Sequence, residues 1–313
     1  MWSPRKTRSQ TRGKSPNASS STAEHVERDV HPPLKATNTA PVTWLPLSSD
    51  AMLKQVQRLP THEADLLLLK QRKLQDENAQ VPTFIKSSQA SGRANDTALA
   101  QAAAATLVFA HEAAGTAVCI SPTGLILTCS HCIAETKQDY KRGKKSWLLF
   151  TSGDPVQARA VACDPYRDLA LLQAIAAPSS FTKFPFIRLA ATSPKPNSQL
   201  LCIGHPGSED LEADTSGIAT DYDVLHISEG RFRGLAVDQD AQDNSEIGAL
   251  MHDCWTHWGH SGAPLIEKTS GKLIGLHSSW DDETGMRRGV GWEALKAFLD
   301  ENVKDLEPLA HVM

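Results

Sequence analysis

The sequence lacks any long apolar run. Nowhere do about 18 apolar residues, the length of a membrane-spanning helix, follow one another. The first 23 residues also lack the apolar core of a secretory signal. We therefore expect no contact with a membrane and an intracellular location, in the cytoplasm or the nucleus.

Cysteine is scarce, and its spacing is irregular. The 313 residues contain six cysteines without a CxxC…CxxC framework, and in a chain that is not exported these thiols are expected to be reduced. His252, Cys254, His257 and His260 are close in sequence, but their spacing does not match a closed tetrahedral zinc site. The sequence therefore predicts no metal and no other cofactor.

An excess of positive charge is absent as well. The net charge is −4, so the whole chain does not resemble a binder of polyanions. The N-terminal arm is the exception, because residues 1–14 are basic and precede the first acid, Glu24. Such an arm is typical of a weak nucleic-acid contact, a nuclear import signal or a solvated tail. A mitochondrial transit peptide ranks behind these, because the arm has too few apolar residues for an amphipathic face.

Three segments follow one another along the chain. Residues 1–47 contain too few apolar residues to offset the entropy of ordering and predict a disordered tail. Residues 48–96 predict a helical extension and a linker. Its first helix begins at Ser49 or Asp50 and ends before Pro60, and Thr61 can cap the second. Residues 97–313 form the remaining domain, which begins with a short Ala-rich helix.

Most of that domain consists of short apolar runs, among them TLVFA, GTAVCI, GLILTC and QLLCIG. Turn sequences such as SPTG, SGDP and TSGK separate them. Many short strands with regular turns indicate an all-β sandwich or barrel. The closing sequence WEALKAFLDENVKDL has apolar residues at helical spacing and predicts a C-terminal helix.

Ser261, in the sequence GHSGA, is a candidate nucleophile. The nucleophile elbow of an α/β-hydrolase requires a helix directly after the serine, whereas Pro264 and a hairpin-like segment follow here. An ordinary turn is the second interpretation. The third is the chain order His, Asp, Ser of a catalytic triad. His131 follows a predicted hairpin and Asp168 precedes an apolar run, so both are available as partners.

Four blocks carry a family resemblance: GTAVCISPTGLILTCSHCI, DPYRDLALL, LLCIGHPG and GHSGAPLIEKTSGKLIGLH. In this order, over residues 105–303, they resemble the trypsin-like serine peptidases, nearest to the Deg-type proteases and glutamyl endopeptidases. The resemblance implies an all-β, chymotrypsin-like double β-barrel with a site in the cleft between the barrels. It also implies a serine endopeptidase that acts on protein or peptide substrates through His131, Asp168 and Ser261. The backbone N–H groups of Gly259 and Ser261 would form the oxyanion hole.

The specificity of such an enzyme depends on residues near Ser261. Thr256 and His277 lie where glutamyl endopeptidases carry a threonine and a histidine, and Ser278 follows directly, so the resemblance implies that these three residues bind substrate. A hydroxyl and an imidazole can both donate to a carboxylate, so we hypothesise a preference for Glu or Asp before the scissile bond. Alternatively, His277 is a core histidine and Trp255 or Trp258 narrows the pocket.

Two features depart from the family. His260 stands where trypsins carry an aspartate that pairs with a freed N-terminus, which predicts no activation by N-terminal cleavage. Cys132 lacks its usual partner before Gly115, so we expect a buried thiol. Two rival functions stay open: a catalytically inactive trypsin-fold binding module, which His260 favours, and a nucleic-acid-associated protein that acts through its basic arm.

Overall fold

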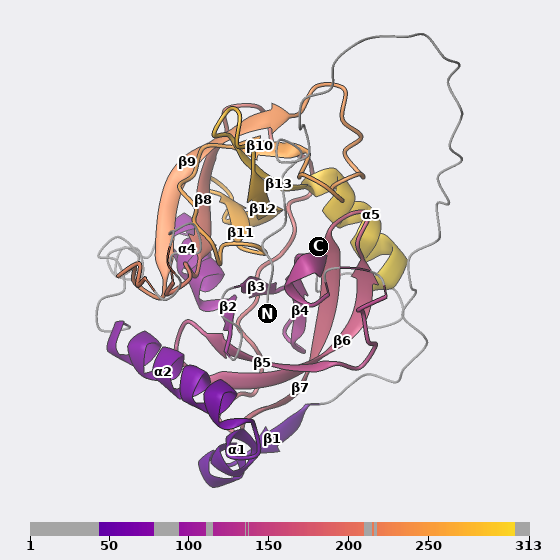
Figure 1. Ribbon diagram of the computed structural model, residues 1–313. Helices are drawn as coiled ribbons and strands as arrows, with labels where there is room; N and C mark the ends of the chain where they lie inside the picture. The colour runs from indigo at the N-terminus through magenta and orange to yellow at the C-terminus, as the bar shows by residue number, and fades with distance from the viewer. Residues whose placement is uncertain are drawn as a thin grey trace.

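Six strands close into a first β-barrel (Figure 1). The computed structural model describes residues 44–77, 94–110, 115–134, 136, 138–209, 215 and 218–303. The ring runs β7–β4–β3–β2–β5–β6, and β6 pairs with β7 to close it. All of these pairings are antiparallel. The strands are β2 (Thr106–Phe109), β3 (Thr116–Cys119), β4 (Leu125–Thr128), β5 (Lys145–Phe150), β6 (Pro155–Asp164) and β7 (Leu169–Pro178).

The second barrel is also closed and antiparallel, in the order β10–β13–β12–β11–β8–β9. Two closed six-stranded barrels confirm the expected all-β, chymotrypsin-like double-barrel architecture. The strands are β8 (Gln199–Gly204), β9 (His226–Leu235), β10 (Leu250–His252), β11 (Pro264–Glu267), β12 (Lys272–Trp280) and β13 (Arg287–Gly291).

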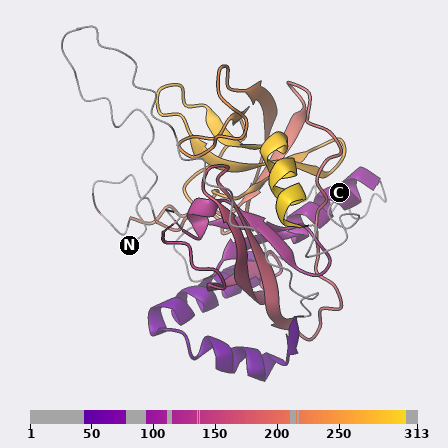
Figure 2. The ribbon, with the colours of Figure 1, turned by 90° about the vertical axis from the view of Figure 1, so that its right-hand side faces the viewer.

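Helices cover part of the first barrel, as both ribbon views show (Figures 1 and 2). They are α1 (Ser49–Val56), α2 (Thr61–Glu77) and α4 (Ala94–Ala104), whereas the C-terminal helix α5 (Trp292–Asn302) lies against β12 and β13 of the second barrel. Alternate residues of a strand face opposite sides of a sheet, so Leu107 points to the barrel interior while Val108 packs under α1 and α2. This cover explains why β2 is buried along its whole length and why its sequence is apolar after Thr106.

The N-terminal extension differs in detail from the expectation. Residues 45–47, at the end of the expected disordered tail, form β1 (Leu45–Leu47), which pairs in parallel with β7. Helix α1 is capped by Ser48, whose side chain accepts a hydrogen bond from the Ala51 N–H at 3.3 Å. The rest of the tail, including the basic residues 1–14, and most of the linker lie outside the described residues. No helix among the described residues is long and apolar enough to span a membrane.

Candidate active site

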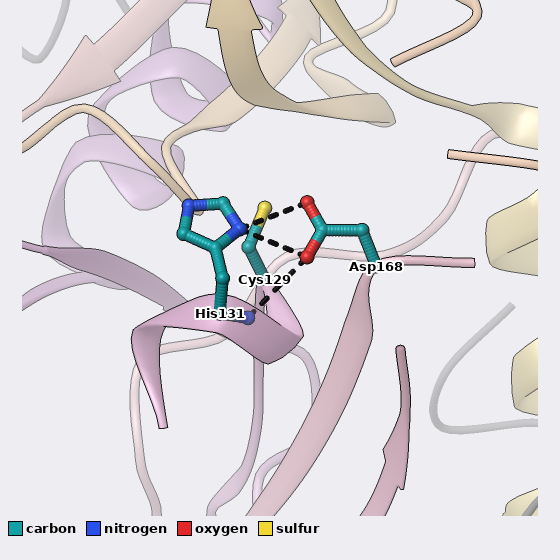
Figure 3. Close-up of side chains that lie close together, drawn as sticks. All are labelled: Cys129, His131 and Asp168. Carbon is teal, nitrogen blue, oxygen red and sulfur yellow. Dashed lines mark hydrogen bonds and ion pairs between the residues drawn. The ribbon is translucent and has the colours of Figure 1, made fainter. Parts of the chain in front are cut away.

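His131 and Asp168 form a hydrogen-bonded pair (Figure 3). His131 lies in a short 3-10 helix, Ser130–Cys132, directly after β4. Asp168 precedes β7 and has a left-handed backbone, with φ of 55°. The Nδ1 atom of His131 lies 2.9 Å from Oδ1 and 3.0 Å from Oδ2 of Asp168. Because β4 pairs with β7, the two strands hold this contact in place.

Asp168 is fully buried, and donors from two directions satisfy its carboxylate. The Ser130 hydroxyl donates to Oδ1 at 2.9 Å, and the His131 backbone N–H donates to the same oxygen at 3.3 Å. From the second barrel, the Ser278 hydroxyl donates to Oδ2 at 2.8 Å. A buried charge is tolerated only when it is hydrogen-bonded in this way, so the network keeps the carboxylate fixed against His131.

Ser261 lies at the junction of the two barrels, in the loop between β10 and β11. Its hydroxyl donates to the carbonyl of Ser278 at 3.2 Å. Its own carbonyl accepts from the Thr116 N–H at 2.9 Å and from the Cys132 thiol at 3.4 Å. Ser278 therefore contacts both Asp168 and Ser261, and Cys132, the residue after His131, also contacts Ser261. The structure thus brings the three predicted residues into one region.

A glycine lets the turn before Ser261 pack closely against the segment that carries His205. Gly259 has φ of +97°, and a Cβ atom there would overlap the carbonyl oxygen of His205. The carbonyl of Trp258 accepts from the Gly207 N–H at 2.6 Å. In a trans peptide the C=O and the next N–H point in opposite directions, so the Gly259 N–H points away from Gly207. Among the described residues, none accepts a hydrogen bond from the N–H of Gly259 or of Ser261.

The predicted specificity residues Thr256 and His277 are both buried. Thr256 is 3% exposed, and its buried hydroxyl has no partner among the described residues. His277 is equally buried, and its Nδ1 lies 3.1 Å from Nε2 of His252. Burial, reinforced by the nearby His252 and His260, holds the pKa of His277 well below its usual value. The ring is therefore neutral near pH 7.

The match to a known family decides the identity of the domain. Residues 115–276, just over half of the chain, match the model described as the trypsin-like peptidase domain. The chain belongs to the trypsin-like peptidase family. The matched segment contains His131, Asp168, Gly259 and Ser261.

Solved structures with a similar backbone include "Crystal structure of the serine endoprotease from Yersinia pestis". That match has 21% sequence identity and a TM-score of 0.47, and covers 67% of this chain and 66% of that chain. A second is an inactive form of Rv3671c from M. tuberculosis H37Rv, with 16% identity and a TM-score of 0.47. It covers 65% of this chain and 88% of that chain. The chain thus spans about two thirds of the Yersinia pestis protein.

Cys129 adds a third polar atom beside the trypsin-like His–Asp pair (Figure 3). Its sulfur, a His131 ring nitrogen and an Asp168 oxygen all lie within 4.8 Å of one another, a spacing that could hold a metal ion. The direct His131–Asp168 bond favours a different role, because ligands of one ion point at the ion and not at each other. The Cys129 thiol donates to the carbonyl of His277 at 3.4 Å.

His260, the departure from trypsins, is buried in this loop. Its Nδ1 lies 3.0 Å from the carbonyl of His257, and its ring packs against Gly204, where a Cβ atom would overlap it. Burial lowers the pKa of His260 to about 3, so the side chain is neutral. A neutral, enclosed ring cannot replace an aspartate as the partner of a charged amine. That activation does not need N-terminal cleavage stays a prediction.

Three contacts near the site were not predicted from the sequence. Thr116 bonds to the Ser261 loop, Ser130 donates to Asp168, and Arg287 on β13 reaches the carbonyl of Thr256. A polar residue in a buried apolar strand was a usable signal for Thr116. The sequence held no comparable signal for Arg287, because strand β13, on which it lies, was not expected. The Ser278 hydroxyl donates to Asp168, and its contact with substrate stays a prediction.

Proposed function

We propose that the chain is a serine endopeptidase that hydrolyses peptide bonds through His131, Asp168 and Ser261. One observation carries the proposal: a buried carboxylate is bonded to a histidine ring and, through Ser278, connected to Ser261. In a trypsin-like domain this arrangement supplies a base, an orienting acid and a nucleophile. Proteins or peptides are the proposed substrates.

The first step forms an acyl-enzyme. Ser261 Oγ attacks the peptide carbonyl carbon while Nε2 of His131 takes the hydroxyl proton, and Asp168 holds the Nδ1 proton and stabilises the imidazolium. The hydroxyl gives up its bond to the Ser278 carbonyl as it turns toward His131. The imidazolium then protonates the leaving amine as the C–N bond breaks. Water, deprotonated by His131, hydrolyses the ester and restores the serine.

The oxyanion of each tetrahedral intermediate needs hydrogen-bond donors. The N–H groups of Gly259 and Ser261 fit this role, because no described residue occupies them. Gly207 supports it by holding the Trp258 carbonyl, which turns the Gly259 N–H outward. Donors fixed before the reaction stabilise developing charge without the cost of reorganisation.

We further propose a preference for Glu or Asp before the scissile bond. The unpartnered hydroxyl of Thr256 is the observation that supports it, because a buried donor without a partner is costly and a carboxylate would satisfy it. The two tryptophans of this loop lie near the region: the Trp255 ring contacts the rings of His226 and His260, and Trp258 lies edge-on to Trp280.

Labelling with a fluorophosphonate probe tests the catalytic proposal. We expect wild type to be labelled and Ser261→Ala to be unlabelled. Ser152→Ala, at an exposed serine, is the matched control and should be labelled like wild type. If folded wild type is not labelled, the endopeptidase proposal fails and the chain is better described as an inactive binding module.

A further inference from the structure

Arg287 lies beside the predicted specificity residues although it is distant from them in sequence. On β13 it is opposite His252 of β10 on one side and Trp280 of β12 on the other. Its Nη2 donates to the carbonyl of Thr256 at a long 3.5 Å, and Nη1 donates to the carbonyl of Gly285 at 3.0 Å. The guanidinium therefore reaches the segment that leads into Ser261.

The hydrogen bonds of Arg287 are incomplete. Its Nε is buried and has no partner, and none of the described carboxylates lies within ion-pair distance of it. The only acceptors among the described residues are two backbone carbonyls. A guanidinium has five N–H donors and can bind a carboxylate in a bidentate pair. The guanidinium of Arg287 therefore has N–H donors available for a carboxylate.

The histidines nearby cannot supply the positive charge that a carboxylate requires. Burial lowers the pKa of His252 to about 3 and that of His277 well below its usual value. Arg287 is the cross-strand partner of His252, whose Nε2 lies 3.1 Å from Nδ1 of His277, and its charge helps to lower the pKa of both rings. Arginine stays protonated at any pH at which the enzyme would work. The permanent charge in this region therefore comes from Arg287.

We propose that Arg287 is a specificity-determining residue that binds the carboxylate of a Glu or Asp side chain before the scissile bond. The inference rests on the proposed endopeptidase function. The carboxylate would accept from the guanidinium and from the Thr256 hydroxyl, and so partner two groups that are now unsatisfied. The long bond to the Thr256 carbonyl is the weakest of Arg287's contacts and the easiest to exchange.

Matched peptides that differ only in Glu or Gln before the scissile bond test the proposal. The two side chains have nearly the same shape, so the ratio of their kcat/KM values reports recognition of charge. We expect wild type to favour Glu about 10- to 100-fold, the range of a hydrogen bond to a charged group. Arg287→Gln should bring the ratio close to one. Arg188→Gln is the matched control. It changes an exposed arginine in the segment that links β7 to β8, and it should keep the wild-type ratio.

The outcomes separate the two proposals. Absence of probe labelling in wild type refutes the endopeptidase, whereas labelled wild type with a ratio near one refutes only the role of Arg287. An unchanged ratio in Arg287→Gln also refutes it. If that variant does not fold, Arg287→Lys decides: a lysine cannot bind bidentately, so the ratio should fall but stay above one. An unchanged ratio in that variant would overturn the proposal.

Discussion

The hydroxyl of Thr116 donates to the carbonyl of Gly259 at 2.7 Å and joins the first barrel to the turn before Ser261. The hydroxyl oxygen of Thr116 also accepts a hydrogen bond from the His205 N–H at 3.1 Å, and the Thr116 N–H donates to the Ser261 carbonyl. One buried residue of β3 thus holds both ends of the turn and the end of β8. The position of the proposed oxyanion donors depends on how the two barrels meet at this residue.

Thr116→Val should impair both stability and turnover. Valine keeps the shape but leaves the Gly259 carbonyl and the His205 N–H unpartnered, which costs about 1–3 kcal/mol of unfolding free energy. A turn that relaxes by a fraction of an ångström should lower kcat/KM about 10- to 100-fold. Thr116→Ser keeps the hydroxyl and is the matched control. Denaturant unfolding and peptide hydrolysis measure the two effects. Wild-type kcat/KM in a destabilised valine variant would show that the hydroxyl acts only on stability.

Gly259→Ala should abolish probe labelling of Ser261. The new Cβ would overlap the His205 carbonyl, in addition to the strain of a side chain at φ of +97°. Gly234 separates these causes, because it has φ of +100° and no atom within 4 Å of the added Cβ. Gly234→Ala should therefore introduce only the backbone strain, about 1 kcal/mol, and Ser261 should still be labelled in this variant. Equal labelling of the two variants would contradict a role for the close approach to His205.

Ser278→Ala should slow catalysis without removing it. The change takes away the donor to Oδ2 of Asp168, while the donors from Ser130 and His131 remain. We expect kcat to fall about tenfold, the scale of one hydrogen bond to a charged group, with KM little changed. Ser279→Ala, at the next residue of the same strand, is the control. A larger rise in KM than fall in kcat would instead assign Ser278 to substrate binding.

Much of the fold could be predicted because burial on both faces leaves a simple pattern. Strands β3 and β4 are buried along their whole length and are apolar except for Thr116 and Thr128, and both were expected. Strand β9 was missed because only two of its 10 residues are buried and its sequence, HISEGRFRGL, mixes charged residues with glycine. Strands β10 and β13 are short, and only pairing within the closed barrel makes them strands.

The candidate site was predictable to the extent that it lies in local motifs. His131, Asp168, Gly259 and Ser261 each occur in a recognisable block. The supporting contacts join residues far apart in the chain: Thr116 to Gly259, and Arg287 to Thr256. Such contacts depend on strand register and on the docking of two barrels, which no single segment encodes. The bond from Ser278 to Asp168 was not predictable either, because the register of β12 shifts between His277 and Ser279.

Buried neutral histidines should make the protein sensitive to mild acid. Burial lowers the pKa of His205, His252 and His260 from 6.5 to about 3 in the folded state. In the unfolded chain these rings take up protons near pH 6.5, whereas the folded protein resists protonation until about pH 3. Below pH 6.5 the unfolded state therefore binds more protons, and folding stability falls as the pH falls.

The size of the effect makes the prediction testable. Each such histidine contributes a slope of up to about 1.4 kcal/mol per pH unit below its unfolded pKa. We expect the denaturant midpoint to be constant from pH 8 to 7 and to drop steeply between pH 6 and 5, a range above the titration of ordinary carboxylates. His252→Gln should reduce that slope by about the contribution of one histidine, whereas His62→Gln, at an exposed position, should leave it unchanged.

A midpoint that is flat from pH 7 to 5 would mean that the rings accept protons in the folded state. The histidine cluster behind Ser261 would then be charged in mild acid and could take part in binding a carboxylate, and Arg287 would not be the sole source of positive charge there.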